Sequence, residues 1–338
     1  MGVMLPRPLL APEQAPLPAD LCPASYRPHA LHDGTRIWLE KNCYVDVWIA
    51  LVHSLGLEPR AMLGGAVALD FLGDQWTFLK PGHGDLRTLY GIEVQELTVW
   101  RPLADHVREH LAAGRLVSVE ADAWWLPDTA ATDYRRQHTK TTILIARDEP
   151  AAQRLTYFHN AGLYTLDGED YRQTLANGGL PMPLYAEWVD TRRRTARPEH
   201  ALRLLASARL DEHLAWRPDD NPMRRFEARF AADLSGLQQQ AEAAPEAALA
   251  QYHAWAFAAT RQLGAAMELL ALHLQWLGGC EAAAGHALAI AQACKALILK
   301  GARAVATRRP LAAEALFDGL AHDWAAMLAS LGHARPGD

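Results

Sequence analysis

The stretch KTTILIARDEPAAQRLTYFHN, residues 140–160, contains two runs of β-forming residues separated by a polar, turn-forming segment. The runs cover 140–146 and 154–158, and Asp, Glu and Pro stand between them, which predicts an antiparallel hairpin. If the hairpin is centred on Glu149, the residue entering the first strand lies opposite the one leaving the second, and His138 faces Asn160. Asn-Ala-Gly after a strand is also the composition of an ordinary turn.

A nucleophile for such a pair stands upstream, in the stretch NCYVDVWIALVHSLG. Its apolar spacing predicts a helix with Asn42 as the cap and Gly56 as the stop. Cys43 opens this helix, where the unpaired N–H groups and the macrodipole favour a thiolate. In the papain-like Cys-His-Asn arrangement, His138 takes the thiol proton and Asn160 orients the imidazole. The competing interpretation is that Cys43 is a small core residue.

Composition excludes several classes of protein. The 338 residues carry a net charge of −6, whereas a general nucleic-acid binder is usually basic. The Pro-rich N-terminus is not a secretory signal, and no stretch has the apolar length of a membrane span. The four cysteines are too far apart to form a metal-binding pair, so no metal site is expected. No bound cofactor is expected either. We expect a cytoplasmic protein with reduced thiols.

The composition changes near residue 190, from Trp, Tyr, Gly and β-branched runs to long Ala- and Leu-rich segments. The expected fold class is therefore α+β, with an antiparallel sheet in the N-terminal domain and an all-α second domain. We expect a Pro-rich extension over 1–24, a papain-like domain over 25–190 and a helical domain over 191–338. The predicted helices of the last domain cover 198–213, 221–242, 245–277, 280–306 and 310–332. The Gly-rich stretch PGHGDL, residues 81–86, predicts a flexible turn.

The stretches NCYVDVWIALVHSLG, VSVEADAWWLPDT, LTYFHNAGLYTLDGEDY and RQLGAAMELLALHLQWLGG resemble an uncharacterised bacterial family. Its genes tend to neighbour amino acid:carrier-protein ligases, so the resemblance implies a protein that acts on a carrier-bound aminoacyl group. The first half is more distantly similar to butirosin biosynthesis protein H and to double-glycine, bacteriocin-processing cysteine peptidases. Those peptidases carry a Gln six residues before the Cys, and here that place is Ile37. The backbone N–H of Cys43 or the amide of Asn42 is then expected to form the oxyanion hole.

Further residues are assigned around this site. Asp122, Trp124, Trp125 and His159 are predicted to bind substrate, with Asp122 holding a substrate amine; alternatively, Asp122 caps a turn at the edge of a Trp-rich core. Carrier proteins are usually acidic around the phosphopantetheine. A basic cluster is therefore a candidate docking surface, or else a solvated linker. Its members are Arg192, Arg193, Arg194 and Arg197.

The leading hypothesis is an acyltransferase. Cys43 receives an aminoacyl group from the phosphopantetheine thioester of a carrier protein and passes it to a small acceptor. With water as the acceptor the same chemistry makes a cysteine hydrolase. The alternative class is a non-catalytic adaptor that binds a carrier protein or its ligase, and the missing Gln favours that class. The expected partners are the aminoacylated carrier protein and the small acceptor, with the ligase as a further candidate; neither nucleic acid nor a membrane is expected.

Overall fold

The computed structural model describes residues 13–39, 42–176 and 185–333, so the first half of the predicted extension 1–24 lies outside the described residues. The chain forms two compact units, and neither is a continuous stretch. Unit 1 contains the residues up to Pro28, Val47–Leu57 and His83–Pro198, and unit 2 contains His29–Asp46, Glu58–Gly82 and the chain from Glu199 on. Two early segments, ahead of residue 83, therefore belong with the late helices.

Unit 1 is built on a six-stranded antiparallel sheet with the strand order β3-β8-β4-β5-β6-β7. The strands are β3 (Glu93–Glu96), β4 (Leu116–Asp122), β5 (Lys140–Glu149), β6 (Arg154–His159), β7 (Gly162–Asp167) and β8 (Ala186–Asp190). The hairpin expected from residues 140–160 is present as β5 and β6. Its turn is the 3-10 segment η5 (Pro150–Ala152) followed by Gln153 in the left-handed region.

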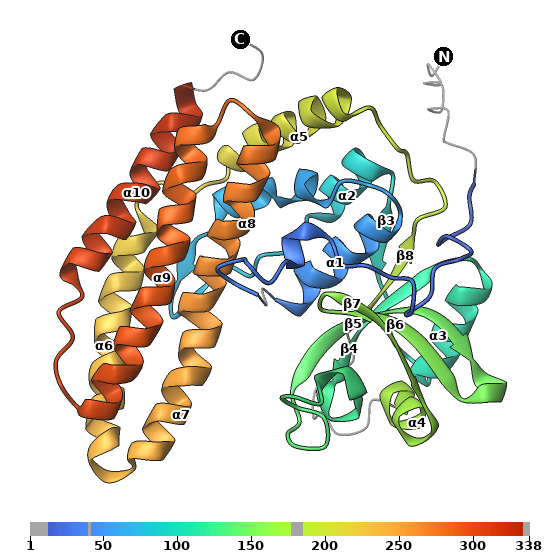
Figure 1. Cartoon of the computed structure of the whole chain (residues 1–338), viewed down its shortest axis with the longest axis horizontal. Coiled ribbons are helices and arrows are strands. Elements are labelled where there is room, and N and C mark those ends of the chain that lie inside the picture. Colours follow the sequence, from blue (N-terminus) through green and yellow to red (C-terminus); the bar gives the residue numbers. More distant parts are fainter. Residues whose placement is uncertain (1–12, 40–41, 177–184, 334–338) are drawn as a thin grey trace, which may run out of the picture. The chain divides into compact units, whose positions relative to one another are not determined.

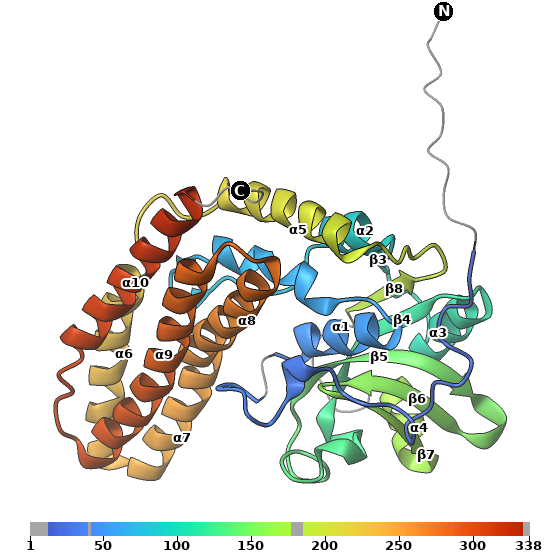
Figure 2. The ribbon, with the colours of Figure 1, turned by 45° about the horizontal axis from the view of Figure 1, so that its top comes forward.

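One face of this sheet carries the apolar core of unit 1. Alternate residues of β4 and β5, such as Val119 and Ile143, are completely buried there. They pack against α3 (Leu103–Ala112) and α4 (Gly168–Ala176) through side chains such as Val107 and Tyr171. Helix α1 (Cys43–Ser54) runs beside the sheet from Val47 on (Figure 2). The side chains of β4 therefore alternate between the apolar core and a second face that carries Asp122.

The other elements of the first 198 residues are short. They include helix α2 (His83–Tyr90) and the 3-10 segments η1 (Ala30–His32), η2 (Pro59–Ala68), η3 (Ala123–Trp125) and η4 (Pro127–Thr129). The two-stranded β1 (Phe71–Leu72) and β2 (Gln75–Trp76) belong to unit 2. The flexible turn predicted for residues 81–86 was wrong, because the chain enters α2 at His83.

Unit 2 consists mainly of helices, and α6 to α10 run side by side in yellow to red (Figure 1). They are α5 (Glu199–Leu214), α6 (Pro222–Ala243), α7 (Pro245–Ala256), α8 (Gln262–Leu277), α9 (Glu281–Thr307) and α10 (Glu314–His333). The predicted ranges are right within a few residues, except that the single helix expected over 245–277 is interrupted by a π-turn, Phe257–Arg261. The mixed α+β class and the helical C-terminal half are thus confirmed.

Helix α9 is long and apolar enough to cross a membrane by length and composition alone, contrary to the expectation that no stretch would be. Core helices of soluble proteins pass the same test. Here α9 packs against α8 and α10, and its Ile290, Cys294 and Leu297 are completely buried in the unit. Burial among these helices accounts for part of its apolar composition, since 39% of the apolar window is buried.

Candidate functional site

The feature that organises the candidate site is an imidazole held by a buried carboxylate. Asp122 is the last residue of β4, and β5 begins opposite it, with Asp122 paired to Lys140. His138 lies just before β5, and its Nδ1 is 2.6 Å from Oδ2 of Asp122. A carboxylate can only accept, so Nδ1 donates and Nε2 is the nitrogen left to exchange a proton. Nearly half of the His138 side chain is exposed, whereas Asp122 is 2% exposed.

The loop between β4 and β5 holds this imidazole from its face as well as its edge. The Trp124 ring stacks on His138, with centroids 4.5 Å apart and planes 10° from parallel. The loop is closed by a bond from the Arg135 N–H to the Trp124 carbonyl, 3.2 Å, with Arg135 at a φ of 57°. Asp170 of α4 secures it by accepting from the Tyr134 hydroxyl at 2.8 Å and from Arg135. The orientation of His138 is therefore set by several independent contacts.

The predicted pairing of His138 with Asn160 was wrong. The strand β5 continues to Glu149, which pairs with Arg154, and further along the hairpin Leu144 pairs with Phe158. The turn of the hairpin therefore lies beyond Glu149, further along the chain than expected. When the centre of a turn moves by one residue, the partner of every residue in the strand changes by two positions. Asn160 instead starts the turn between β6 and β7, with a φ of 45°. Asn adopts this left-handed conformation more readily than most residues, as the turn interpretation expected.

His159 was predicted to bind substrate, but it is 1% exposed. Its Nδ1 lies 2.5 Å from Asp128 and its Nε2 lies 2.8 Å from the Thr141 hydroxyl. The Tyr157 hydroxyl donates to the other oxygen of Asp128 at 2.5 Å. Burial, with the Asp128 charge added to it, raises the pKa of the Tyr157 phenol strongly. This network is internal, and it ties η4, which carries Asp128, to the sheet.

The other residues assigned to substrate binding are also engaged locally. The second oxygen of Asp122 accepts the Trp124 N–H at 3.1 Å, capping η3, so the carboxylate that was predicted to bind an amine serves the loop and the imidazole. The guanidinium of Arg135 lies 4.3 Å over the Trp125 ring. The capping alternative for Asp122 thus describes the observed contact. Trp124 is the aromatic side chain that touches the candidate base.

Cys43 opens α1, as predicted, and the start of this helix is firmly anchored within unit 2. Asn42 caps it by accepting the Val45 N–H at 2.8 Å. The same Asn42 side chain donates to the Leu79 carbonyl at 2.9 Å, so one of its two amide hydrogens is already committed. Asp46, one turn into the helix, accepts from His32 at 2.9 Å, and both side chains are almost completely buried. The negative charge of Asp46, which would disfavour a thiolate nearby, therefore has a close partner in His32.

The segment ahead of Cys43 is held by a buried glutamate of α8. Glu268 is 2% exposed, and its carboxylate accepts the backbone N–H groups of Ile37 at 2.8 Å and Trp38 at 2.9 Å. The Trp38 indole donates to the Ala291 carbonyl at 3.2 Å. Ile37, which stands at the place where double-glycine peptidases carry a Gln, thus uses its backbone N–H for anchoring. Cys43 belongs to unit 2 and the Asp122–His138 pair to unit 1, and α1 is shared between the units.

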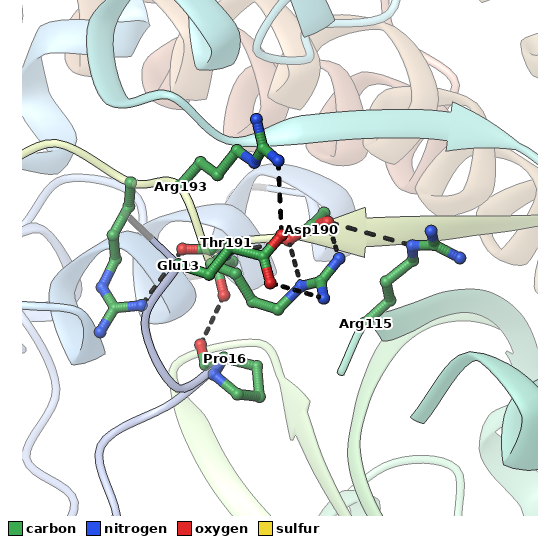
Figure 3. Close-up of polar contacts among 8 residues, drawn as sticks. Glu13, Pro16, Arg115, Asp190, Thr191 and Arg193 are labelled. Atoms are coloured by element: carbon green, nitrogen blue, oxygen red, sulfur yellow. Dashed lines mark hydrogen bonds and ion pairs between the residues drawn. The ribbon is translucent and has the colours of Figure 1, made fainter. Parts of the chain in front are cut away.

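Three of the four arginines predicted to dock a carrier protein contact the N-terminal segment, Arg193 among them through Glu13 (Figure 3). Arg192 binds Asp190 through two nitrogens, at 3.0 and 2.6 Å, and lies 3.4 Å from Glu13, as does Arg193. Close by, the Thr191 hydroxyl donates to the Pro16 carbonyl at 2.5 Å. Arg194 donates to the carbonyl of Ala15, and Arg197 donates to the carbonyls of Thr88 and Leu89. The contacts of Thr191, Arg192, Arg193 and Arg194 form a clamp that holds residues 13–16.

Sequence reasoning missed a second imidazole held by a carboxylate. His83 Nε2 lies 3.1 Å from Oε1 of Glu187, which is completely buried and also accepts from the Tyr185 hydroxyl at 2.7 Å. Burial raises the pKa of Tyr185, and the hydrogen bond to Glu187 adds to the shift. No local sequence pattern indicates this pair, because His83 opens α2 and Glu187 lies in β8, far along the chain. Within residues 13–39, 42–176 and 185–333, no group of three or more His, Cys, Asp or Glu side chains is placed to hold a metal ion.

Comparison with known proteins places the chain in a family. A search of curated proteins found no match to this sequence. The DUF1839 N-terminal domain model matches residues 27–191, and the DUF1839 C-terminal domain model matches residues 199–333. The two matches follow each other along the chain, and the second begins with the helical half, at residue 199. The chain therefore belongs to the DUF1839 family, with both of its domains present.

Proposed function

We propose that this protein is a papain-like cysteine acyltransferase in which Cys43 is the nucleophile, His138 the base and Asp122 the residue that orients the base. The observation that carries the proposal is the 2.6 Å contact between His138 Nδ1 and a carboxylate that is 2% exposed. A buried acid on Nδ1 fixes the tautomer and stabilises the imidazolium that forms when Nε2 takes a proton. Asp122 takes the role that was first assigned to Asn160.

The proposed substrate is an aminoacyl thioester on the phosphopantetheine of a carrier protein. The Cys43 sulfur attacks the acyl carbon, the bond from that carbon to the phosphopantetheine sulfur breaks, and the released thiolate takes the proton that His138 accepted from Cys43. A small amine acceptor then attacks the acyl-enzyme and passes its proton to His138. The acyl–sulfur bond breaks and Cys43 leaves as a thiolate. Water as the acceptor gives the hydrolase variant.

A second candidate is the non-catalytic adaptor that binds a carrier protein. The observation in its favour is the oxyanion site: Ile37 stands where the peptidases carry Gln, and its N–H is bound to Glu268. One hydrogen of the Asn42 amide is also committed, to Leu79. The oxyanion role of Asn42 stays a prediction, as does carrier docking by the clamp arginines. Of these arginines, Arg193 has a 43% exposed side chain beside its contact with Glu13.

Cysteine alkylation tests the proposed base. The rate of iodoacetamide labelling is measured at each cysteine by mass spectrometry across pH 5 to 9, in a Cys22→Ser background, because hydrogen bonds from Ser25 lower the pKa of Cys22. Cys280 and Cys294 are internal controls, since burial raises the pKa of both thiols. An ordinary thiol labels appreciably only near a pKa of about 8.5. We expect Cys43 to label rapidly at pH 6.

Matched variants identify the partner of Cys43. His138→Ala is expected to abolish labelling at pH 6, and Asp122→Ala to slow it, because the imidazole loses its orienting acceptor. His200→Ala removes an exposed histidine of α5 and should leave the rate unchanged. If Cys43 labels identically in all three variants, His138 is not its base and the adaptor becomes the leading function.

Intact-mass measurement tests the substrate class. The wild-type chain is incubated with an aminoacyl-pantetheine thioester, and we expect the mass of one aminoacyl group to be added at Cys43 and removed by hydroxylamine. The Cys43→Ala chain should gain no such mass. If Cys43 reacts rapidly with iodoacetamide but is not acylated by any aminoacyl thioester, the proposed nucleophile is retained and the proposed substrate is rejected.

A further inference from the structure

Unit 1 contains a hollow of about 780 Å³ that lies apart from His138 along the sheet. It is formed by the C-terminal half of α3, the start of β4, the end of β5 and Pro16 of the clamped N-terminal segment. Because Leu116 lines it and Asp122 ends the same strand, the hollow and the candidate base are at opposite ends of β4. Four arginines and two carboxylates line this hollow, here called the arginine groove: Arg108, Arg115, Arg147, Arg154, Asp148 and Glu149.

Two of the arginines are neutralised by the two carboxylates. Asp148 is 2% exposed and accepts from Arg108 Nε at 3.0 Å. It also accepts from the hydroxyl of Tyr171 at 2.8 Å. Glu149 accepts two hydrogen bonds from Arg154, at 2.8 and 2.7 Å. Both carboxylates of the groove are therefore paired with an arginine. The two remaining guanidinium groups are those of Arg115 and Arg147.

The positive charge of Arg115 is poorly compensated. Its Nε lies 4.0 Å from Oδ2 of Asp190, which is too long for a hydrogen bond, and that oxygen already accepts from Arg192 at 2.6 Å (Figure 3). The Arg115 Nε is buried and has no hydrogen-bond partner among the described residues. Its guanidinium lies 5.0 Å over the Trp188 ring. A buried donor without an acceptor is costly, so Asp190 satisfies Arg115 poorly, and 34% of the Arg115 side chain is exposed and open to a ligand.

Arg147 is the second guanidinium of the groove without a hydrogen-bonded carboxylate. It donates to the uncharged carbonyl of Leu21 at 2.9 Å, and no carboxylate of the described chain lies within ion-pair distance of it. The net charge of the six groove side chains is therefore +2, in a chain whose overall net charge is −6. An excess of positive charge confined to one hollow of an acidic protein attracts an anion there rather than over the whole surface.

We propose that the arginine groove binds a small molecule that carries a phosphate group, with Arg115 and Arg147 as the phosphate ligands. Guanidinium groups match the oxygens of a phosphate through paired N–H donors, and two of them balance its double charge. The hollow is large enough to hold the rest of a metabolite-sized ligand. This site is independent of the proposed acyltransfer, because it involves neither Cys43 nor His138.

Calorimetric titration of the full chain with pyrophosphate, at constant ionic strength, tests the site. We expect saturable binding of one pyrophosphate, and a rise in Kd of about tenfold or more in Arg147→Gln and in Arg115→Gln. Arg147 is exposed, so its replacement is not expected to disturb folding. Arg172→Gln is the matched control, because it removes an exposed arginine of unit 1 that pairs with Glu169 and does not line the groove.

Three results would overturn the proposal: no saturable binding, equal Kd values in the groove variants and in Arg172→Gln, or equal affinity for citrate. The last result would mean that any polyanion is accepted and that phosphate is not selected. The Cys43→Ala chain should bind pyrophosphate like the wild type, so a failure of the acyltransferase proposal leaves this measurement unaffected.

Discussion

At the scale of single residues, the candidate site depends on which acceptor meets the Nδ1 of His138. The sequence correctly predicted that His138 stands at the entry of a strand. It predicted Asn160 as the residue that orients the imidazole, whereas Asp122 accepts from Nδ1 in the structure. The difference is a matter of hairpin register, and register depends on where the chain turns. The polar residues Arg147, Asp148 and Glu149 look like a turn but continue β5. Their side chains find partners in Leu21, Tyr171 and Arg154, and local composition does not show these contacts.

The buried network around Asp128 makes a prediction at this scale. Asp128→Ala leaves the Tyr157 hydroxyl and the His159 imidazole without their common acceptor. We expect the free energy of unfolding of the chain to fall by about 3 kcal/mol, as when one partner of a buried pair is removed. Urea unfolding followed by far-UV circular dichroism measures this change. Asp74→Ala, at an exposed turn position, is the control and should change stability by less than about 0.5 kcal/mol.

Equal stability of these two variants would show that the network around Asp128 contributes nothing to folding. The loop that carries His138 would then be held by its other contacts, such as those of Asp122 and Asp170.

At the scale of elements, long periodic segments were predictable and short ones were not. Two of the C-terminal helices, α6 and α7, begin at Pro222 and Pro245. Because proline is favoured in the first turn of a helix, the starts of these two helices could be predicted from the sequence. The π-turn Phe257–Arg261 contains neither Pro nor Gly, so no residue in it marks an interruption of the helix that the sequence predicts. Strands β3 and β8 are short and acquire their conformation by pairing with each other across distant sequence.

Helix packing gives a prediction at the element scale. A Cβ built on Gly264 of α8 would lie 2.4 Å from the Trp38 ring, whereas a Cβ on Gly236 of α6 would meet nothing within 4 Å. We therefore expect Gly264→Ala to destabilise the chain by about 1 to 3 kcal/mol through overpacking. Gly236→Ala should stabilise it by up to about 1 kcal/mol through helix propensity. Thermal unfolding of both variants provides the comparison.

The opposite order of stability would mean that Trp38 moves freely. That outcome would contradict the anchoring of the segment before Cys43 by Glu268 and Ala291.

At the scale of the whole molecule, the chain is divided into units that do not follow sequence order. The change of composition near residue 190 correctly marks the start of the helical half. It does not reveal that His29–Asp46 and Glu58–Gly82 belong with that half, because those segments are joined to it by tertiary contacts such as Glu268 with Ile37. The N-terminal clamp is equally remote in sequence, since it joins Glu13 to Arg192 and Arg193. Local propensity carries no signal of contacts at this separation.

The clamp predicts a dependence on pH. Burial alone would raise the pKa of Asp190, but the hydrogen bonds and charge of Arg192 outweigh it and hold that pKa below its ordinary value. The stability that Asp190 contributes is therefore complete above its unfolded pKa of about 3.9 and is lost as pH falls through the lower folded pKa. We expect Arg192→Gln to speed amide exchange at Gln14 about tenfold at pH 7, with the difference from the wild type vanishing near pH 2. Native-state hydrogen exchange measures both.

Arg172→Gln serves as the control here also, and exchange at Gln14 should be unaffected by it. A difference between Arg192→Gln and the wild type that persists undiminished at pH 2 would assign the effect to packing of the arginine rather than to its pairing with Asp190.

The anchoring of Ile37 by Glu268 has a consequence for synthesis on the ribosome. The two residues are 231 positions apart, so the backbone N–H of Ile37 waits on the order of 10 to 50 seconds for its acceptor to be translated. During that interval the segment that leads into Cys43 has been made while α8 has not. The contact that anchors the segment before Cys43 therefore cannot form until most of the chain has been translated. A stalled or truncated product ending before α8 would keep the Asn42 cap and the His32–Asp46 pair but would lack the Glu268 anchor.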